Sequence, residues 1–192
     1  MMKARGPTPA GAGFWTPGAS GGQPMMRPLA AYEPAEWSEL FVASAGASAA
    51  LAGLVFVAVS INIERILQVK GLPERALETV LSLLIVVVVS IVGLIPGQSE
   101  TALGIELLAS ALVFGVTIAI LSVESLPQGS EPAYWLWSRM FVRAIAVVPL
   151  VVGAISVLAE AGGGLYWIAG AIIGAIIGSV ANAWVLLVEI QR

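Results

Sequence analysis

The sequence predicts an all-α integral membrane protein, a helical bundle of about five transmembrane helices. Of its 192 residues, 58% are hydrophobic and only 11% are charged, and the mean hydropathy is +0.94. In soluble domains about a quarter of the residues are charged. The apolar residues gather in long segments, and a chain of this length cannot bury all of them in one core. Lipid is therefore the expected solvent for these segments.

Five segments have the length of helical spans, at about 41–61, 79–95, 102–121, 140–158 and 165–188. The second contains a β-branched run, Ile85 to Val89, which in water would suggest a strand. A lone strand cannot satisfy its backbone hydrogen bonds in lipid, so a helix is expected there. Pro96 and Gly97 end this span, and the short turn after them predicts an antiparallel hairpin with the third span.

Residues 1 to about 36 differ in composition from the rest of the chain. The part from Gly6 to Pro28 is rich in glycine and proline and contains no apolar stretch of signal-peptide length. We expect a disordered tail, followed by a transmembrane domain over 37–192. An alternative is that translation starts at Met25 or Met26 and that the preceding residues are an extension of the gene model.

The basic residues near the spans predict the orientation of the chain. With five spans, one side receives the 62–78 loop, the 122–139 loop and the C-terminus. This side carries Arg65, Lys70, Arg75, Arg139 and Arg192. The other side receives the two short turns, which contain neither lysine nor arginine, and the N-terminal tail, in which only Arg27 is near a span. The positive-inside rule therefore places the N-terminus outside and the C-terminus in the cytosol.

The composition argues against several classes of function. Histidine, cysteine and aspartate are absent, which excludes disulfides, thiolate chemistry, histidine-based catalysis and ordinary zinc sites. We therefore expect no enzyme activity, no catalytic residue, no metal and no cofactor. The net charge of −3 provides no basic excess for binding nucleic acid.

Small residues recur at helical spacing on the first and fifth spans. The fifth span carries Gly170, Gly174, Gly178 and Asn182 in one row, and the first span carries Ala45, Ala49 and Gly53. Residues four apart share a helix face, and small residues let another helix approach closely. One interpretation is tight packing between the first and fifth spans. The other is a homo-oligomer interface around a pore, and both can hold.

Four polar residues lie within or at the ends of the spans: Glu106, Arg143, Asn182 and Asn62. Glu106 lies about one turn inside the third span on the outer side. It is a candidate to bind a cation or a proton there, and snorkelling to the headgroups is the alternative. Arg143, Asn182 and Asn62 would form an inner polar cluster, or else make structural hydrogen bonds and reach lipid phosphate. Glu106 and Arg143 enter from opposite faces and should not pair.

The charged residues from Glu64 to Glu78 are spaced for ion pairs along a helix. A short amphipathic connector on the cytosolic side explains them. Docking of a soluble partner is the alternative explanation.

Several stretches resemble a group of small bacterial, largely actinobacterial, multi-span proteins. They are the stretch from Trp37 to Leu67, the turn from Gly93 to Ser99 with Leu103 to Leu107, Gly162 to Trp167, and Ala181 to Ile190. Some members of this group are labelled modulator of FtsH protease. The resemblance implies a location in the bacterial cytoplasmic (inner) membrane and assigns no functional residue.

Three functions are therefore expected as candidates. The first is a non-enzymatic accessory or scaffold role through helix contacts, with the lipid bilayer, a second copy or another membrane protein as partner. The second is a small homo-oligomeric channel or transporter. The third is modulation of a membrane protease.

Overall fold

The computed structural model describes residues 31–69, 71–124 and 133–190, without the side chains of 122–124, 133–143, 146, 189 and 190. All regular secondary structure in these ranges is helical, which confirms the all-α part of the predicted fold class. A 3-10 turn, η2 (Pro34–Trp37), leads into the helices. These are α1 (Ser38–Ile61), α2 (Ile63–Gln68), α3 (Leu72–Gly93), α4 (Glu100–Glu124), α5 (Ala133–Leu158) and α6 (Leu165–Ile190). Of the predicted tail, 1–36, residues 1–30 lie outside the described residues.

Among the described residues, four helical segments are long and apolar enough to cross a membrane. They are Pro34–Ile61, Leu72–Gly93, Glu100–Leu121 and Leu165–Val188. In α5 the apolar stretch with described side chains is shorter, Val147–Leu158, although the helix continues through Pro149 over 26 residues. The protein thus has the helices of a multi-span membrane protein.

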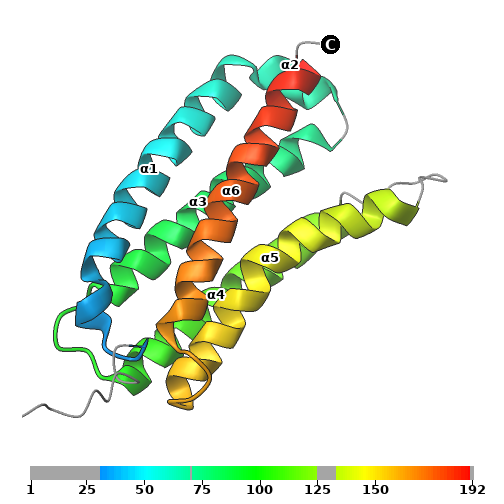
Figure 1. Cartoon of the computed structure of the whole chain (residues 1–192). Helices are drawn as coiled ribbons and strands as arrows, with labels where there is room; N and C mark the ends of the chain where they lie inside the picture. Colours follow the sequence, from blue (N-terminus) through cyan, green and yellow to red (C-terminus); the bar gives the residue numbers. More distant parts are fainter. Residues whose placement is uncertain (1–30, 70, 125–132, 191–192) are drawn as a thin grey trace, which may run out of the picture.

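The helices run up and down between two ends of an elongated bundle (Figure 1). The end that we name the turn end carries η2, the α3–α4 turn and the α5–α6 turn. The opposite end carries α2 and the C-terminal part of α6, and we name it the α2 end. Helices α3, α4, α5 and α6 pack around a common interior, each against two neighbours, while α1 lies outside this group and packs mainly on α3. Toward the α2 end, α5 leans away from α6 (Figure 1).

The interior of the four-helix group is filled by apolar side chains. Helix α4 contributes Leu103, Leu107 and Ala111, and α5, α6 and α3 add further buried residues. A second, smaller cluster at the α2 end joins Ile66 of α2 to Leu72 and Ala76 of α3 and to Leu186 of α6. The short helix α2 therefore covers the end of the bundle through one buried isoleucine, as expected of an amphipathic connector.

Helix α3 begins earlier than the predicted span of 79–95. Gly71 has a left-handed backbone with φ of 85°, and Pro73 follows in the first turn of the helix, where its missing N–H costs nothing. No helix-breaking residue lies between Pro73 and Thr79, so the helix starts at Leu72 and the charged residues 74, 75 and 78 belong to it. It ends at Gly93 because the residue before Pro96 is disfavoured in a helix.

Candidate functional site

Helix α1 presents two different faces. Its buried residues are Phe41, Ser44, Ser48 and Ala52, and this row lies on the side where α1 packs against α3. In the predicted row, Ala45 is half-buried and Ala49 and Gly53 are exposed. A Cβ built on Gly53 would meet no atom within 4 Å. The expected tight pairing of the first and fifth spans is therefore not what the structure has, because α1 only touches α6.

The glycine row of α6 is divided between contact and open space. A Cβ on Gly174 would lie 2.9 Å from Cγ2 of Ile145, so this glycine permits close packing with α5. Gly170 faces open space, and Gly178 and Asn182 are half-buried. The neighbouring row, Ala171, Ala175 and Ser179, is the one that is buried in the bundle.

At the turn end, the loop before α4 is tied to the predicted polar residue Glu106. Nε2 of Gln98 donates a hydrogen bond to Oε2 of Glu106 over 2.6 Å, and both side chains are half-buried. The Ser110 hydroxyl donates a hydrogen bond to the backbone carbonyl of Glu106, one turn earlier in α4. The Gln98 side chain thus binds the carboxylate, which agrees with a structural role for Glu106. Binding of a cation or a proton by Glu106 stays a prediction.

The predicted inner cluster is only partly described. Nδ2 of Asn62 donates to the carbonyl of Ala58 over 2.9 Å, a bond within its own helix, where it closes the end of α1. Asn182 is half-buried on α6. The side chain of Arg143 lies outside the described residues, so its predicted contacts remain a prediction.

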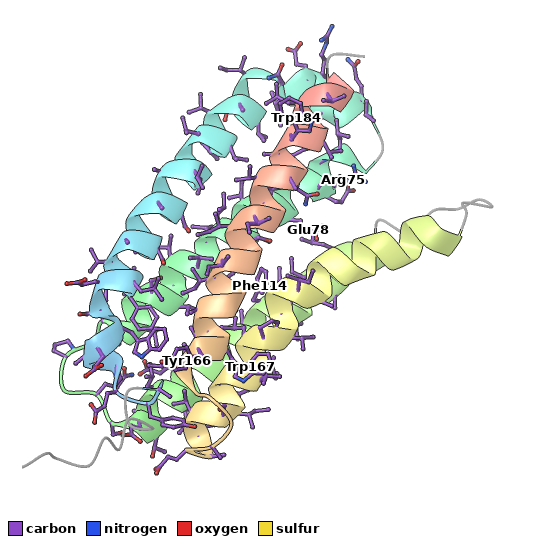
Figure 2. The ribbon with its side chains drawn as sticks, in the orientation of Figure 1. Arg75, Glu78, Phe114, Tyr166, Trp167 and Trp184 are labelled. Atoms are coloured by element: carbon purple, nitrogen blue, oxygen red, sulfur yellow. The ribbon has the colours of Figure 1, made fainter. Side chains whose placement is uncertain are left out.

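Sequence reasoning missed a buried carboxylate near the α2 end. The side chain of Glu78 is 7% exposed, and the adjacent Thr79 is fully buried with its hydroxyl donating to the carbonyl of Arg75 over 2.8 Å. Arg75 and Glu78 lie on the part of α3 nearer the α2 end (Figure 2). The missed signal was Pro73, which starts the helix before these charges and carries them into the span.

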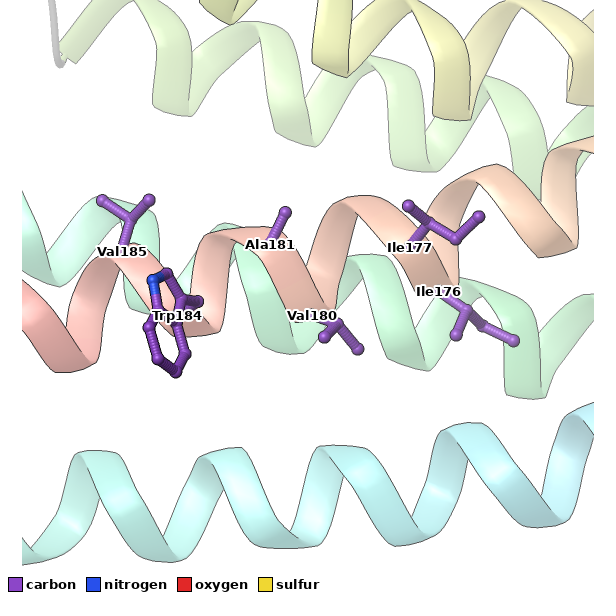
Figure 3. A pocket seen from close by; sticks show the side chains of 6 residues that line it. All are labelled: Ile176, Ile177, Val180, Ala181, Trp184 and Val185. Atoms are coloured by element: carbon purple, nitrogen blue, oxygen red, sulfur yellow. The ribbon is translucent and has the colours of Figure 1, made fainter.

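A shallow apolar hollow lies on the outer face of α6, with α1 running across from it (Figure 3). It measures about 640 Å³ and is lined by Ile176, Ile177, Val180, Ala181, Trp184 and Val185. Trp184 stands 71% exposed at its end nearer α2. The lining provides only apolar contact, which suits lipid chains or an apolar helix rather than a polar substrate.

Comparison with protein-family models, with curated proteins and with solved structures gives no match to this chain. The resemblance to small multi-span bacterial proteins therefore stays a prediction.

Proposed function

We propose that this protein is a non-enzymatic, five-span protein of the bacterial cytoplasmic membrane that acts through helix contacts within the bilayer. In this proposal α1 is the contact helix. Its partner is a second copy or another membrane protein. The turn end faces outward and the α2 end faces the cytosol.

The observation that carries this proposal is the one-sided packing of α1. Its side away from α3 exposes small residues over nearly three turns: Ala43, Gly46, Ala47, Ala49, Ala50 and Gly53. Large exposed residues of α1, such as Val42 and Leu54, stand only at the two ends of this stretch, whereas the outer side of α4 exposes large residues such as Leu112, Val113 and Val116 along its middle. Small residues on an outer face allow the backbone of a partner helix to come close, which is how helices associate in a membrane.

The packed interior supports contact rather than conduction by one chain. The space enclosed by α3, α4, α5 and α6 holds apolar residues such as Leu107, Leu150 and Ile172, all nearly inaccessible. A homo-oligomeric channel is the alternative, and its pore would form between copies. It would therefore need the same α1 contact.

The aromatic residues support the placement in the bilayer. Trp167 and Trp184 are both exposed near opposite ends of α6. They are 17 positions apart on the helix, about 26 Å along the axis at 1.5 Å per residue. This approaches the hydrocarbon thickness of about 30 Å, so both indoles can lie at headgroup level.

The test uses the absence of cysteine from the native chain. We would introduce Gly46→Cys or Gly53→Cys on α1, and Val113→Cys on α4 as the control, since Val113 is 69% exposed. Oxidation in native membranes should give disulfide-linked dimers from the α1 variants and not from the control. For a different partner, a benzophenone maleimide on the same cysteines should give one defined adduct.

Two results would overturn the proposal. One is the absence of dimer and adduct from both α1 variants. The other is equal crosslinking from position 113, which would indicate random collision in the bilayer. If the α1-linked assembly forms, reconstituting it in liposomes and measuring ion flux decides between the contact role and the channel.

A further inference from the structure

The residues before α1 fold back onto the α5–α6 turn. The Tyr32 hydroxyl accepts a hydrogen bond from the backbone N–H of Gly163 over 3.2 Å, across 131 residues of sequence. A Cβ on Gly164 would lie only 2.7 Å from the Tyr32 ring, and would also collide with the carbonyl oxygen of Ala31. The segment therefore lies directly against the backbone of the turn, at a position where only glycine leaves room.

A second contact of the same segment fastens it to the start of α6. The rings of Trp37 and Tyr166 meet edge to face, with centroids 4.7 Å apart and planes at 86°. Such aromatic pairs stabilise beyond the area they bury. Tyr32 and Trp37 together attach both ends of the segment to the α5–α6 turn and α6.

The turn that receives this segment is held in shape by its own hydrogen bonds. The Ser156 hydroxyl donates to the carbonyl of Ala161 and accepts from the N–H of Gly164, the latter over 2.7 Å. Nε1 of Trp167 donates to the carbonyl of Gly162 over 2.8 Å. Three hydrogen bonds of its own therefore hold the turn that contacts residues 31–37.

The packing of α1 on α3 leaves two buried hydroxyls without partners among the described residues. On the face that packs against α3, Ser48 is fully buried and its hydroxyl has no hydrogen-bond partner among the described residues. The same holds for Ser90 on α3. Buried hydroxyls without partners are costly, and small residues such as Ala52 bury little apolar area.

The other end of α1 has the geometry of a hinge. Asn62 separates α1 from α2 with a backbone that is not helical, φ of −107° and ψ of 15°. Beyond it, Ile66 of α2 is anchored in the cluster with Leu72 and Leu186. A movement of α1 about Asn62 leaves this anchor in place.

We propose that residues 31–37 form an outer latch that holds α1 against the bundle, and that its release lets α1 swing about Asn62. Release exposes the serine face of α1, in addition to its small-residue face, to a partner helix. The latch thus regulates the contact made by α1. This inference rests on the proposed function only in naming α1 as the contact helix.

The test measures the attachment of α1 inside one chain. Phe41 contacts Gly93, and α1 and α3 run antiparallel, so Ser44 and Ser90 lie at the same level three residues further along each helix. In the full-length protein with Ser44→Cys and Ser90→Cys, oxidation in membranes forms an intramolecular disulfide. We expect Gly164→Ala and, separately, Tyr32→Ala to slow its formation several-fold.

The matched control is Gly97→Ala. Gly97 also has a left-handed backbone, with φ of 70° against 48° at Gly164, but a Cβ there would meet no atom within 4 Å. The control should crosslink at the parental rate. Unchanged rates in both latch variants, or an equal loss in the control, would overturn the latch.

A separate measurement keeps the two proposals distinguishable. Crosslinking between chains from Gly46→Cys should increase when Gly164→Ala opens the latch. If it stays absent in every variant while the intramolecular rate falls, the latch stands and the contact role of α1 fails. If the intramolecular rate never changes, the latch fails whatever α1 contacts.

Discussion

The Phe41 ring of α1 lies directly over the backbone of Gly93 on α3, where a Cβ would come within 2.5 Å of Cε2. Phe41 is almost completely buried, so it has no free space into which to turn. This contact fixes the register of the antiparallel pair α1 and α3.

Replacing Gly93 by alanine should destabilise the protein, because the methyl group must displace a buried ring. Overpacking of this kind costs about 1–3 kcal/mol. Thermal unfolding in detergent would measure it, with Gly46→Ala on the open face of α1 as the control that should change little. Adding Phe41→Leu should restore part of the loss, and a strictly additive double variant would contradict the contact.

The glycine row of α6 provides a matched pair of variants. Gly174→Leu should disturb the packing of α6 on α5, because its side chain would enter the space of Ile145. Gly170→Leu places the same side chain in open space and should be tolerated. We expect a difference of about 1–3 kcal/mol between the two in unfolding experiments. Equal stability of both variants would show that Gly174 is not a packing position.

The hydrogen bond between Gln98 and Glu106 should contribute modestly to the stability of the turn end. Gln98→Ala removes the donor and should lower stability by about 0.5–1.5 kcal/mol. Glu106→Gln keeps an acceptor at the same place and should cost less. Hydrogen exchange of the 94–99 turn would report the loosening locally, and a larger effect from Glu106→Gln would instead favour a function for the charge.

Replacing the buried Glu78 should lower the stability of the protein more than replacing a charged residue of α2. Glu78→Leu removes a side chain that is 7% exposed and takes part in a polar contact. Glu64→Leu changes an exposed residue of α2 and is the control. We expect a loss of about 1–3 kcal/mol at position 78 and little at position 64. A stabilised Glu78→Leu variant would show that the buried carboxyl group does not stabilise the fold.

Much of the architecture follows from hydropathy and turn residues alone. The predicted segments 102–121 and 165–188 lie within α4 and α6, because long apolar runs bounded by glycine or proline leave few alternatives in lipid. The predicted second span, 79–95, begins seven residues later than α3, because the charges at 74, 75 and 78 favour a connector outside the bilayer. Proline at the first turn, which starts a helix regardless of polarity, was the better guide.

The partner of α1 could not be read from spacing. Rows of small residues on α1 and α6 match each other, yet the buried row of α1 is the one containing Ser44, Ser48 and Ala52, on the side of α3. Which of several similar faces is buried depends on loop lengths and on contacts between distant segments. The contact of Tyr32 with Gly163 is of this kind, and no periodicity in the sequence indicates it.

That long-range contact also sets an order of events during synthesis. The first span enters the membrane with its serine face uncovered, and α3 can cover it only after α2 has been made. Tyr32 finds its acceptor turn only when Gly163 has been made, 131 residues later. The closing of the N-terminal segment is therefore a late step in biogenesis, because a chain that stops before Gly163 has α1 and α3 but lacks the turn that binds Tyr32.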